Sequence, residues 1–216
     1  MDDYAAERER MVAQQLQTRA IKDPRVLDAM REVPRHLVVP EGQCAAAYGD
    51  HALPIGHGQT ISQPYMVGLM CQELRPESDE SVLEVGAGSG YQAAVLSRLA
   101  CEVTTIERIP ALAEFARRNL ARAGCDNVRV IAGDGTLGWP EGAPYDGIIV
   151  AAAAPDLAEP LVEQLAEGGR LVVPVGQRGV QDLMVAEKVR GRLAVRKVCQ
   201  CVFVPLIGEH GWENGG

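Results

Sequence analysis

The sequence predicts an α/β fold with a mainly parallel, doubly wound sheet, and three observations support this prediction. Short apolar runs alternate with helical patterns from residue 82 onward, as in successive strand–helix units. The run at 82–85 leads directly into a glycine-rich turn, Gly86-Ala87-Gly88-Ser89-Gly90, which a helical pattern follows. The next expected strand ends on Glu107, about twenty residues after that turn. Together these features predict a nucleoside site at the carboxyl edge of the sheet.

The region before this core is expected to form helices and loops. A charged helix is expected over 4–19, and Asp23-Pro24 opens a second helix that Pro34 stops. Residues 36–53 have no clear period, which predicts a loop with short extended pieces. A third helix opens at Gln63 or Pro64 and ends near residue 74.

The core follows a strand–helix alternation that changes near its end. Strands are expected at 82–85, 103–107, 128–132, 147–150 and 171–174, and helices at 91–100, 111–123 and 156–165. Gly124 is placed to end a helix, and Gly168-Gly169 to make a tight turn into the fifth strand. Runs at 183–189 and 193–204 alternate around Arg190-Gly191 and predict an antiparallel hairpin. We therefore expect an N-terminal extension with a substrate loop (1–76), a core with its hairpin (77–208) and a loose tail (209–216).

Composition argues against several classes of protein. The net charge of -8 over 216 residues argues against general nucleic-acid binding. No apolar run reaches membrane-spanning length, and the start Met1-Asp2-Asp3-Tyr4 is unlike a signal peptide. The six cysteines include no Cys-x-x-Cys pair and the four histidines lack metal spacing with them, so we expect reduced thiols and no metal. A cytoplasmic monomer that binds neither nucleic acid nor membrane is expected.

The glycine turn and its acidic neighbours indicate which nucleoside ligand is bound. A dinucleotide fingerprint is Gly-x-Gly-x-x-Gly, whereas the turn from Gly86 to Gly90 is one residue tighter. Glu84 stands two residues before the first glycine, where a carboxylate would repel phosphates but suit a sulfonium with an ammonium group. Glu107 can accept both hydroxyls of a ribose. The pattern favours S-adenosylmethionine; the alternative is a glycine-rich turn in another doubly wound enzyme.

A third acidic residue follows the third expected strand. Asp134, in Gly133-Asp134-Gly135, is at the edge where ligands bind in open α/β sheets. Its carboxylate can accept from an adenine amino group, and the next backbone N–H can reach a ring nitrogen. A plain Asp-Gly turn is the alternative.

The segment Gln59-Thr60-Ile61-Ser62-Gln63-Pro64-Tyr65 is the candidate acceptor site. Its two hydroxyls, two amides and the helix start at Pro64 all favour an anion such as a carboxylate. Alternatively, Ser62 or Gln63 only caps the following helix. Local chemistry does not decide between these two interpretations.

Further motifs accompany the glycine turn and the acceptor segment. They are Val33-Pro34-Arg35-His36, Glu84 through Ala94, Thr105-Ile106-Glu107-Arg108, Gly133-Asp134-Gly135, Gly138-Trp139-Pro140-Glu141, Ala143-Pro144-Tyr145-Asp146, Gly168-Gly169-Arg170-Leu171 and Phe203-Val204-Pro205-Leu206. With these motifs the chain resembles the protein-L-isoaspartate O-methyltransferase family over about residues 11–208. Many methyltransferases share the glycine turn, whereas the Gln-Thr-Ile-Ser-Gln-Pro segment is far more specific.

The resemblance implies a fold, an activity and a set of site residues. The fold would be a Rossmann-like class I S-adenosylmethionine-dependent methyltransferase. The enzyme would methylate the free carboxylate of L-isoaspartyl residues in damaged proteins and peptides, leaving S-adenosylhomocysteine, and the ester would collapse to a succinimide. The implied catalytic residue is Ser62, with Thr60, Ile61, His57, Val204 and Pro205 at the substrate and Glu84, Gly86, Ala87, Gly88, Ser89, Gly90, Glu107, Arg108, Asp134 and Gly135 at the cofactor.

Such chemistry needs no general base, because a carboxylate is already a nucleophile at pH 7. Ser62 would orient the acceptor rather than attack, and an extended peptide held by main-chain contacts is expected. The chain departs from the family at four positions. Ala87 and Ala151 stand where threonine is common, Ala20 replaces a frequent glycine, and proline is common near Ala158.

Three other classes remain as alternatives. A methyltransferase of this fold could act on RNA or a small molecule, a non-catalytic relative could bind without turnover, and an oxidoreductase could use a dinucleotide. The acidic charge and the Ser62 segment argue against RNA. The presence of Glu84, Glu107 and Asp134 argues against a non-catalytic relative.

Overall fold

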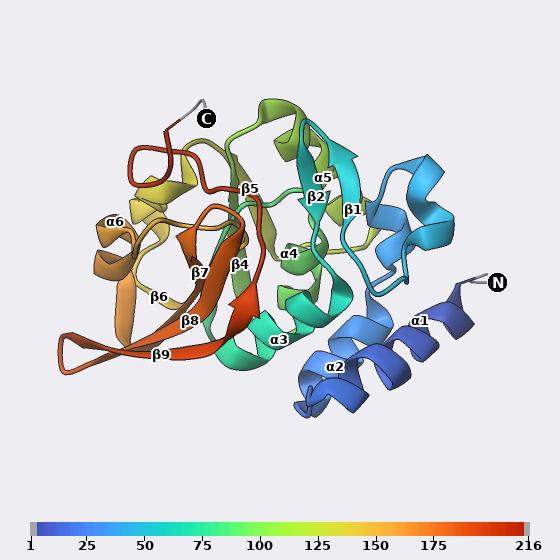
Figure 1. The fold of residues 1–216 in the computed structure, drawn as a ribbon, viewed down its shortest axis with the longest axis horizontal. Helices are drawn as coiled ribbons and strands as arrows, with labels where there is room; N and C mark the ends of the chain where they lie inside the picture. The colour runs from blue at the N-terminus through green and yellow to red at the C-terminus, as the bar shows by residue number, and fades with distance from the viewer. Residues whose placement is uncertain (1–3, 214–216) are drawn as a thin grey trace.

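Residues 4–213 are described by the computed structural model, and one seven-stranded sheet forms their centre (Figure 1). Its strands are β3 (Ser81–Val85), β4 (Glu102–Glu107), β5 (Val128–Ala132), β6 (Tyr145–Val150), β7 (Leu165–Gln177), β8 (Val180–Val189) and β9 (Arg192–Cys201). They lie in the order β5-β4-β3-β6-β7-β8-β9. The first five are parallel neighbours, whereas β8 and β9 are antiparallel. The predicted parallel core with an antiparallel hairpin is confirmed.

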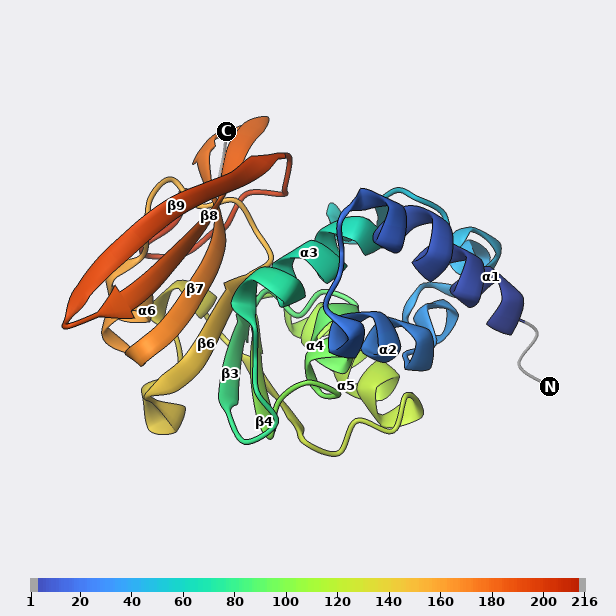
Figure 2. The same ribbon diagram turned by 90° about the horizontal axis from the view of Figure 1, so that it is seen from below.

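Helices pack on both faces of this sheet. They are α1 (Ala5–Met11), α2 (Pro24–Glu32), α3 (Pro64–Leu74), α4 (Tyr91–Leu96), α5 (Pro110–Arg122) and α6 (Glu159–Glu163). A π-helical piece (Val12–Leu16) and a 3-10 turn (Gln17–Arg19) extend α1. Figure 2 shows α1 and α2 at the opposite side of the molecule from β8 and β9. Among the helices of residues 4–213, none is long and apolar enough to cross a bilayer.

Successive side chains along the strands belong to two separate hydrophobic cores, one on each face of the sheet. Val82 and Ile149 belong to the core under α1 to α5, whereas Leu83 and Ile148 belong to the core that includes Leu161 of α6. Both sides of a central strand are therefore apolar, which is typical of parallel sheets covered by helices. Each fully buried aliphatic side chain contributes about 1.5–3 kcal/mol. The sheet edge above these cores is therefore supported by packing on both faces.

Local signals fix where most helices begin and end. Asp23 accepts a hydrogen bond from the backbone N–H of Arg25 (2.9 Å), and Pro24 is the first residue of α2. This is the expected combination of an Asp cap with proline at the first helical position. Gly124, after the end of α5, has a positive φ of 65°, as predicted for a helix terminator.

Several local expectations were wrong. Gly168 and Gly169 do not make a turn; they lie inside β7, where the register against β6 shifts between Leu165 and Arg170. The same glycine pair serves a turn or a bulge, so the sequence does not separate the two. Residues 36–53 contain two 3-10 helices, Arg35–Val38 and Glu41–Ala46, rather than extended pieces. Helices α4 and α6 are also shorter than predicted.

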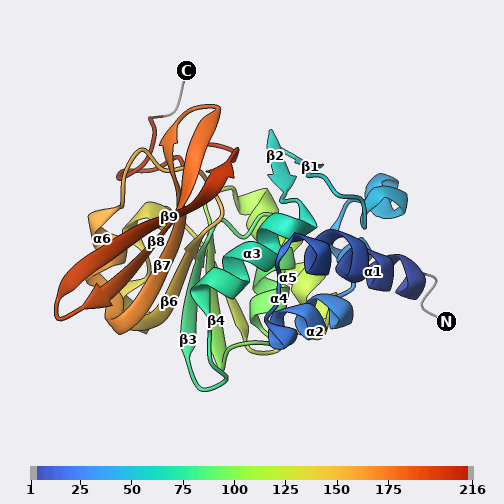
Figure 3. The ribbon, with the colours of Figure 1, turned by 60° about the horizontal axis from the view of Figure 1, so that its bottom comes forward.

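The acceptor segment begins as a strand rather than a loop. β1 (Leu53–Gly56) and β2 (Gln59–Ile61) form a separate antiparallel hairpin. Figure 3 shows this hairpin and the C-terminal segment projecting at the same end of the molecule. The hairpin thus carries the acceptor segment to the carboxyl edge of the sheet.

The C-terminal segment is docked, not loose, as far as residue 213. The backbone N–H of Glu209 donates to Asp134 Oδ2 (2.8 Å), and that of His210 donates to Thr136 Oγ1 (3.1 Å). Trp212 Nε1 donates to the Ala153 carbonyl (3.1 Å). These bonds satisfy backbone groups that a free tail would leave to water. The remainder of the expected tail, 214–216, lies outside the described residues.

Candidate active site

The glycine turn lies directly above the end of β3. Gly86, Gly88 and Gly90 have φ values of 96°, 53° and 84°, a region that side chains rarely adopt. The backbone N–H of Gly86 donates to the Ile106 carbonyl (2.8 Å), which holds the turn across β4. Gly90 also lacks room for a side chain, because a Cβ there would lie 3.2 Å from Leu120 Cγ. Backbone can therefore come close to a ligand at this point.

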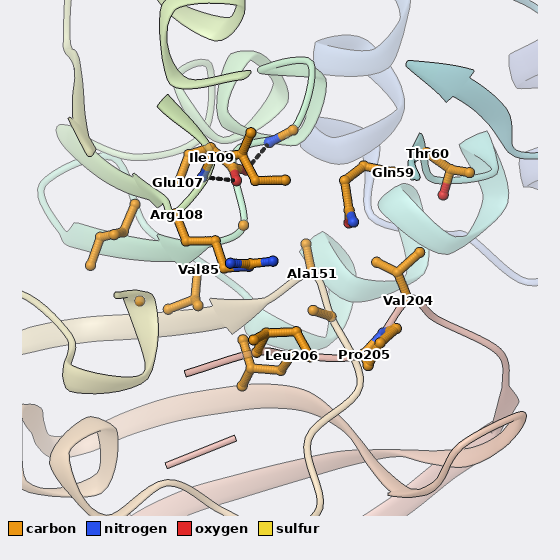
Figure 4. A pocket seen from close by; sticks show the side chains of 16 residues that line it. Gln59, Thr60, Val85, Glu107, Arg108, Ile109, Ala151, Val204, Pro205 and Leu206 are labelled. Carbon is orange, nitrogen blue, oxygen red and sulfur yellow. Dashed lines mark hydrogen bonds between the residues drawn. The ribbon is translucent and has the colours of Figure 1, made fainter. Parts of the chain in front are cut away.

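Glu107 is locked at the end of the neighbouring strand. Its Oε2 accepts from the Gly88 backbone N–H (2.9 Å), and its Oε1 accepts from the Ile109 backbone N–H (2.9 Å). The side chain is buried yet lines a cavity (Figure 4). A carboxylate has about four lone-pair sites, so two bonds leave capacity for ligand hydroxyls.

This first cavity has a volume of about 590 Å³, a figure that includes space open to solvent. Its walls combine Glu107 with apolar groups and with Arg108, whose side chain extends towards Ala151 in Figure 4. The complete lining is Gln59, Thr60, Val85, Gly86, Gly88, Ile106, Glu107, Arg108, Ile109, Gly135, Ala151, Ala152, Val204, Pro205, Leu206 and Ile207. Largely apolar walls with a few polar side chains, Glu107 among them, suit a nucleoside.

A second cavity continues from the first past the glycine turn. Both cavities are lined by Thr60, Gly86, Gly88 and Ala151, and the second also contains Glu84, Ser62 and Ser89. Glu84 is completely buried, accepts a hydrogen bond from Thr105 Oγ1, and has no partner for Oε1. Burial raises the pKa of this carboxyl to about 8, although the Thr105 bond opposes the shift and the Glu107 charge reinforces it.

The unpartnered Oε1 of Glu84 fits a cationic ligand group. A buried acceptor without a partner is costly, and a ligand ammonium or sulfonium in this cavity would remove that cost. The carboxylate also explains why a pyrophosphate is unsuitable here. The cavities therefore match a nucleoside with a cationic end.

The acceptor segment forms the other wall. Ser62 is half-buried and lines both the second cavity and a third, open cleft, while Thr60 and Ala151 line all three. Gln63 occupies the cap position of α3, and no side chain caps that helix. Within residues 4–213 nothing hydrogen-bonds the Ser62 hydroxyl. The capping alternative is thereby ruled out.

The third cavity opens to the surface beside β9. It is lined by Asp50, His51, Ala52, Thr60, Ser62, Gln63, Met66, Ala151, Gln200, Cys201, Val202, Phe203 and Val204. Val204 also lines the first cavity. The open cleft therefore lies next to the donor cavities, with Thr60 and Ala151 in the walls of all three and Ser62 shared by the second and third.

Three predicted residues, His57, Gly90 and Asp134, line none of the three cavities. His57 is exposed at the tip of the β1–β2 hairpin with a φ of 53°, and lines none of the three cavities. Asp134 does not line them either, although Gly135 does. Partial burial would raise the pKa of Asp134, but hydrogen bonds from Glu209 and Thr136 outweigh it and keep the pKa below its usual range.

Some lining residues were given no role from the sequence. Ala152 lines the first cavity just after β6, and Leu206 and Ile207 line it because the chain returns to the sheet edge after β9. That return depends on tertiary pairing between Ala153 and Pro205. Residues 4–213 hold no cluster of three or more His, Cys, Asp or Glu side chains suited to a metal ion.

Comparisons with known proteins agree on one family. Residues 6–211 match the family model described as "Protein-L-isoaspartate(D-aspartate) O-methyltransferase (PCMT)". The chain is 58% identical over 208 residues to a Methanoregula boonei protein of this name, covering 96% of each, and 52% identical over 214 residues to one from Methanospirillum hungatei, covering 99% of each.

Solved structures with the same description have the same fold. One protein-L-isoaspartate O-methyltransferase has a TM-score of 0.84 at 30% identity, covering 94% of this chain and 67% of its own. A Plasmodium falciparum structure described as a putative protein-L-isoaspartate O-methyltransferase, in complex with S-adenosyl-L-homocysteine, has a TM-score of 0.82 at 27% identity, covering 93% and 98%.

Proposed function

The chain belongs to the protein-L-isoaspartate (D-aspartate) O-methyltransferase family, and from that membership we propose how its residues divide the work of methyl transfer. It is an S-adenosylmethionine-dependent enzyme that methylates the free carboxylate of isoaspartyl residues and so initiates repair of damaged proteins. The first and second cavities take the donor, and the third takes the peptide.

The donor contacts follow from the two acidic residues. Glu107 accepts the ribose hydroxyls, and Glu84 faces the cationic end of the donor. The backbone of the turn from Gly86 to Gly90, with Ala87 and Ser89, approaches the donor closely. Arg108, Asp134 and Gly135 serve the adenine end. Support comes from the unpartnered Oε1 of Glu84 and from the position of Glu107 in the wall of the first cavity.

Ser62 orients the acceptor carboxylate. One observation carries this assignment: its hydroxyl has no partner within residues 4–213, and the residue lines both the donor cavity and the open cleft. Thr60, Ile61, Val204 and Pro205 shape the pocket around the isoaspartyl side chain, whereas His57 is free to contact only the flanking peptide. The 1–76 segment supplies Ser62 and its neighbours on the acceptor side, and 77–208 supplies the donor side together with Val204 and Pro205 of the acceptor pocket.

The residues act by positioning and by excluding water. S-adenosylmethionine supplies a methyl group on a cationic sulfur. The acceptor carboxylate needs no base, so Ser62 only donates a hydrogen bond that leaves one carboxylate oxygen free to react. Apolar groups such as Ile61 and Val204 keep water from competing for the methyl group.

We also propose that the enzyme works as a cytoplasmic monomer without nucleic-acid or membrane partners. All six cysteines are free thiols, which suits a reducing compartment. The net charge of -8 disfavours nucleic acid.

The proposed division is tested by comparing Ser62→Ala with Ser78→Ala, an exposed serine outside these three cavities. Loss of one hydrogen bond to a charged group costs about 1.5–3 kcal/mol, so turnover should fall roughly 10- to 100-fold in Ser62→Ala. Binding of S-adenosylhomocysteine, measured by titration calorimetry, should stay within about threefold of the wild type. Loss of that binding in Ser62→Ala would contradict the assignment.

A further inference from the structure

Arg35 is a buried cation without a matching anion. It lies in the 3-10 helix Arg35–Val38, is 0% exposed, and is among the largest fully buried side chains. Within residues 4–213 no carboxylate pairs with it. Burial lowers the pKa of its guanidinium only to about 10, so it stays charged at neutral pH. Buried arginines are usually paired with an acidic group, so this one needs a reason.

Its contacts connect the acceptor segment with the donor side. Nη2 donates to the Ser62 carbonyl (2.7 Å) and Nε donates to the Ala47 carbonyl (2.7 Å). The guanidinium stacks 4.5 Å from the centre of the Tyr91 ring, and Tyr91 is the first residue of α4 and lines the donor cavity with Ser62. Nη1 has no partner.

These contacts have a geometric consequence. Ser62 follows the end of β2, and no side chain caps α3 behind it. The planar guanidinium fixes the Ser62 carbonyl relative to Tyr91, which a flexible single-point donor would do less well. The distance between the acceptor hydroxyl and the donor cavity therefore depends on Arg35.

The charge has an electrostatic consequence as well. The acceptor enters as a carboxylate and leaves as a neutral ester, so a fixed positive charge behind Ser62 favours the substrate over the product. In a partly buried site such a charge is screened less than at the surface. Because the carboxylate loses its charge as the ester forms, this attraction acts on binding of the acceptor, and the effect of Arg35 on the transfer step comes from positioning.

We propose that Arg35 is a positioning residue for the methyl transfer: it holds Ser62 in register with the donor cavity, and its unpaired charge draws the acceptor carboxylate to that serine. This inference rests on the proposed function of the site. The purely structural alternative is that Arg35 only stabilises the N-terminal extension. If that alternative holds, replacing Arg35 lowers stability and weakens the binding of all ligands together, whether the acceptor is charged or neutral.

The test compares Arg35→Met and Arg35→Lys with Arg31→Met. Arg31 is a surface arginine of α2 that pairs with Glu9 and Asp28, so it controls for loss of an arginine. Kinetics would use an isoaspartyl peptide, and a peptide with isoasparagine at the same position would serve as a neutral competitor. Binding of S-adenosylhomocysteine reports on the donor side.

Arg35→Met should raise KM for the isoaspartyl peptide and lower kcat, each by about tenfold, while the inhibition constant of the neutral competitor stays within about threefold. Arg35→Lys keeps the charge and should mainly lower kcat; it carries the test if Arg35→Met does not fold. Binding of S-adenosylhomocysteine should change little in either variant.

Equal weakening of the charged and neutral peptides, or wild-type kinetics in a folded Arg35→Met, would overturn the inference. If the wild-type enzyme failed to methylate the isoaspartyl peptide, the proposed function itself would fail, and the Arg35 variants would not be needed to show it.

Discussion

Binding of S-adenosylhomocysteine is expected to strengthen as the pH rises from 6 to 8, because the Glu84 carboxyl must lose a proton to meet the ligand ammonium. Glu84 is fully buried, and burial raises its pKa to about 8. The groups that face it are Thr105 and Glu107 on β4, Cys71 on α3 and Gln92 on α4. Of these only Glu107 carries a charge, and it favours the protonated form of Glu84.

The size of the effect follows from this pKa. With a pKa of about 8, only about one molecule in eleven has an ionised Glu84 at pH 7, and about one in a hundred at pH 6. Apparent affinity scales with the competent fraction, so the Kd should fall about fiftyfold between pH 6 and pH 8. Roughly one proton should leave the protein for each ligand bound at pH 7.

Titration calorimetry in two buffers with different ionisation heats measures both quantities. S-adenosylhomocysteine is the suitable probe, because it has the ammonium group without the sulfonium. Glu84→Gln cannot ionise, so it should bind weakly and with a nearly flat pH dependence. A wild-type Kd that is constant from pH 6 to 8, or the same slope in Glu84→Gln, would refute the role given to this carboxyl.

Three further predictions concern neighbouring residues. Glu107→Gln replaces a carboxylate that accepts two backbone N–H groups. Since a hydrogen bond to a charged group contributes about 1.5–3 kcal/mol, the substitution should weaken S-adenosylhomocysteine binding, measured by calorimetry, about 10- to 100-fold. Unchanged affinity would exclude the ribose contact. Gly135→Ala would place a Cβ 2.5 Å from Val85 Cγ1 and should destabilise the fold by about 1–3 kcal/mol in urea titrations, whereas Gly133→Ala, with nothing within 4 Å, should not. Because the pKa of Glu84 is raised in the folded protein, protonation of this carboxyl stabilises the fold fully below pH 4.5, and this contribution is lost as the pH rises towards 8. The unfolding free energy of the wild type should therefore fall relative to that of Glu84→Gln by about 1–4 kcal/mol between pH 5 and pH 9. A difference between the two proteins that stays constant with pH would contradict this.

Much of the fold follows from local pattern. The strand at Val82, the glycine turn and Glu107 were predictable because parallel strands are short apolar runs and the turn needs glycine. The hairpin of β8 and β9 was predictable from its alternation around Arg190-Gly191. These features depend on neighbours in sequence.

The misplaced features depend on distant contacts instead. The 208–213 segment is polar enough for a loose tail, but Asp134 and Thr136 bind its backbone. Gly168-Gly169 has the chemistry of a turn, and only pairing with β6 makes it a bulge.

The candidate site shows the same distinction between features set by neighbours in sequence and features set by distant contacts. The sequence identified Ser62 but left capping open, because a cap and an acceptor donor have the same local chemistry. The burial of Arg35 behind Ser62 has no local signal, since it requires Ala47 and Tyr91 to come together.

The most direct test of the account is methyl transfer from labelled S-adenosylmethionine to an isoaspartyl peptide, to its normal aspartyl twin and to RNA. Label should enter only the isoaspartyl peptide, as a base-labile ester on the free carboxylate. Equal labelling of both peptides, labelling of RNA, or no labelling at all would contradict the assignment of the acceptor site at Ser62.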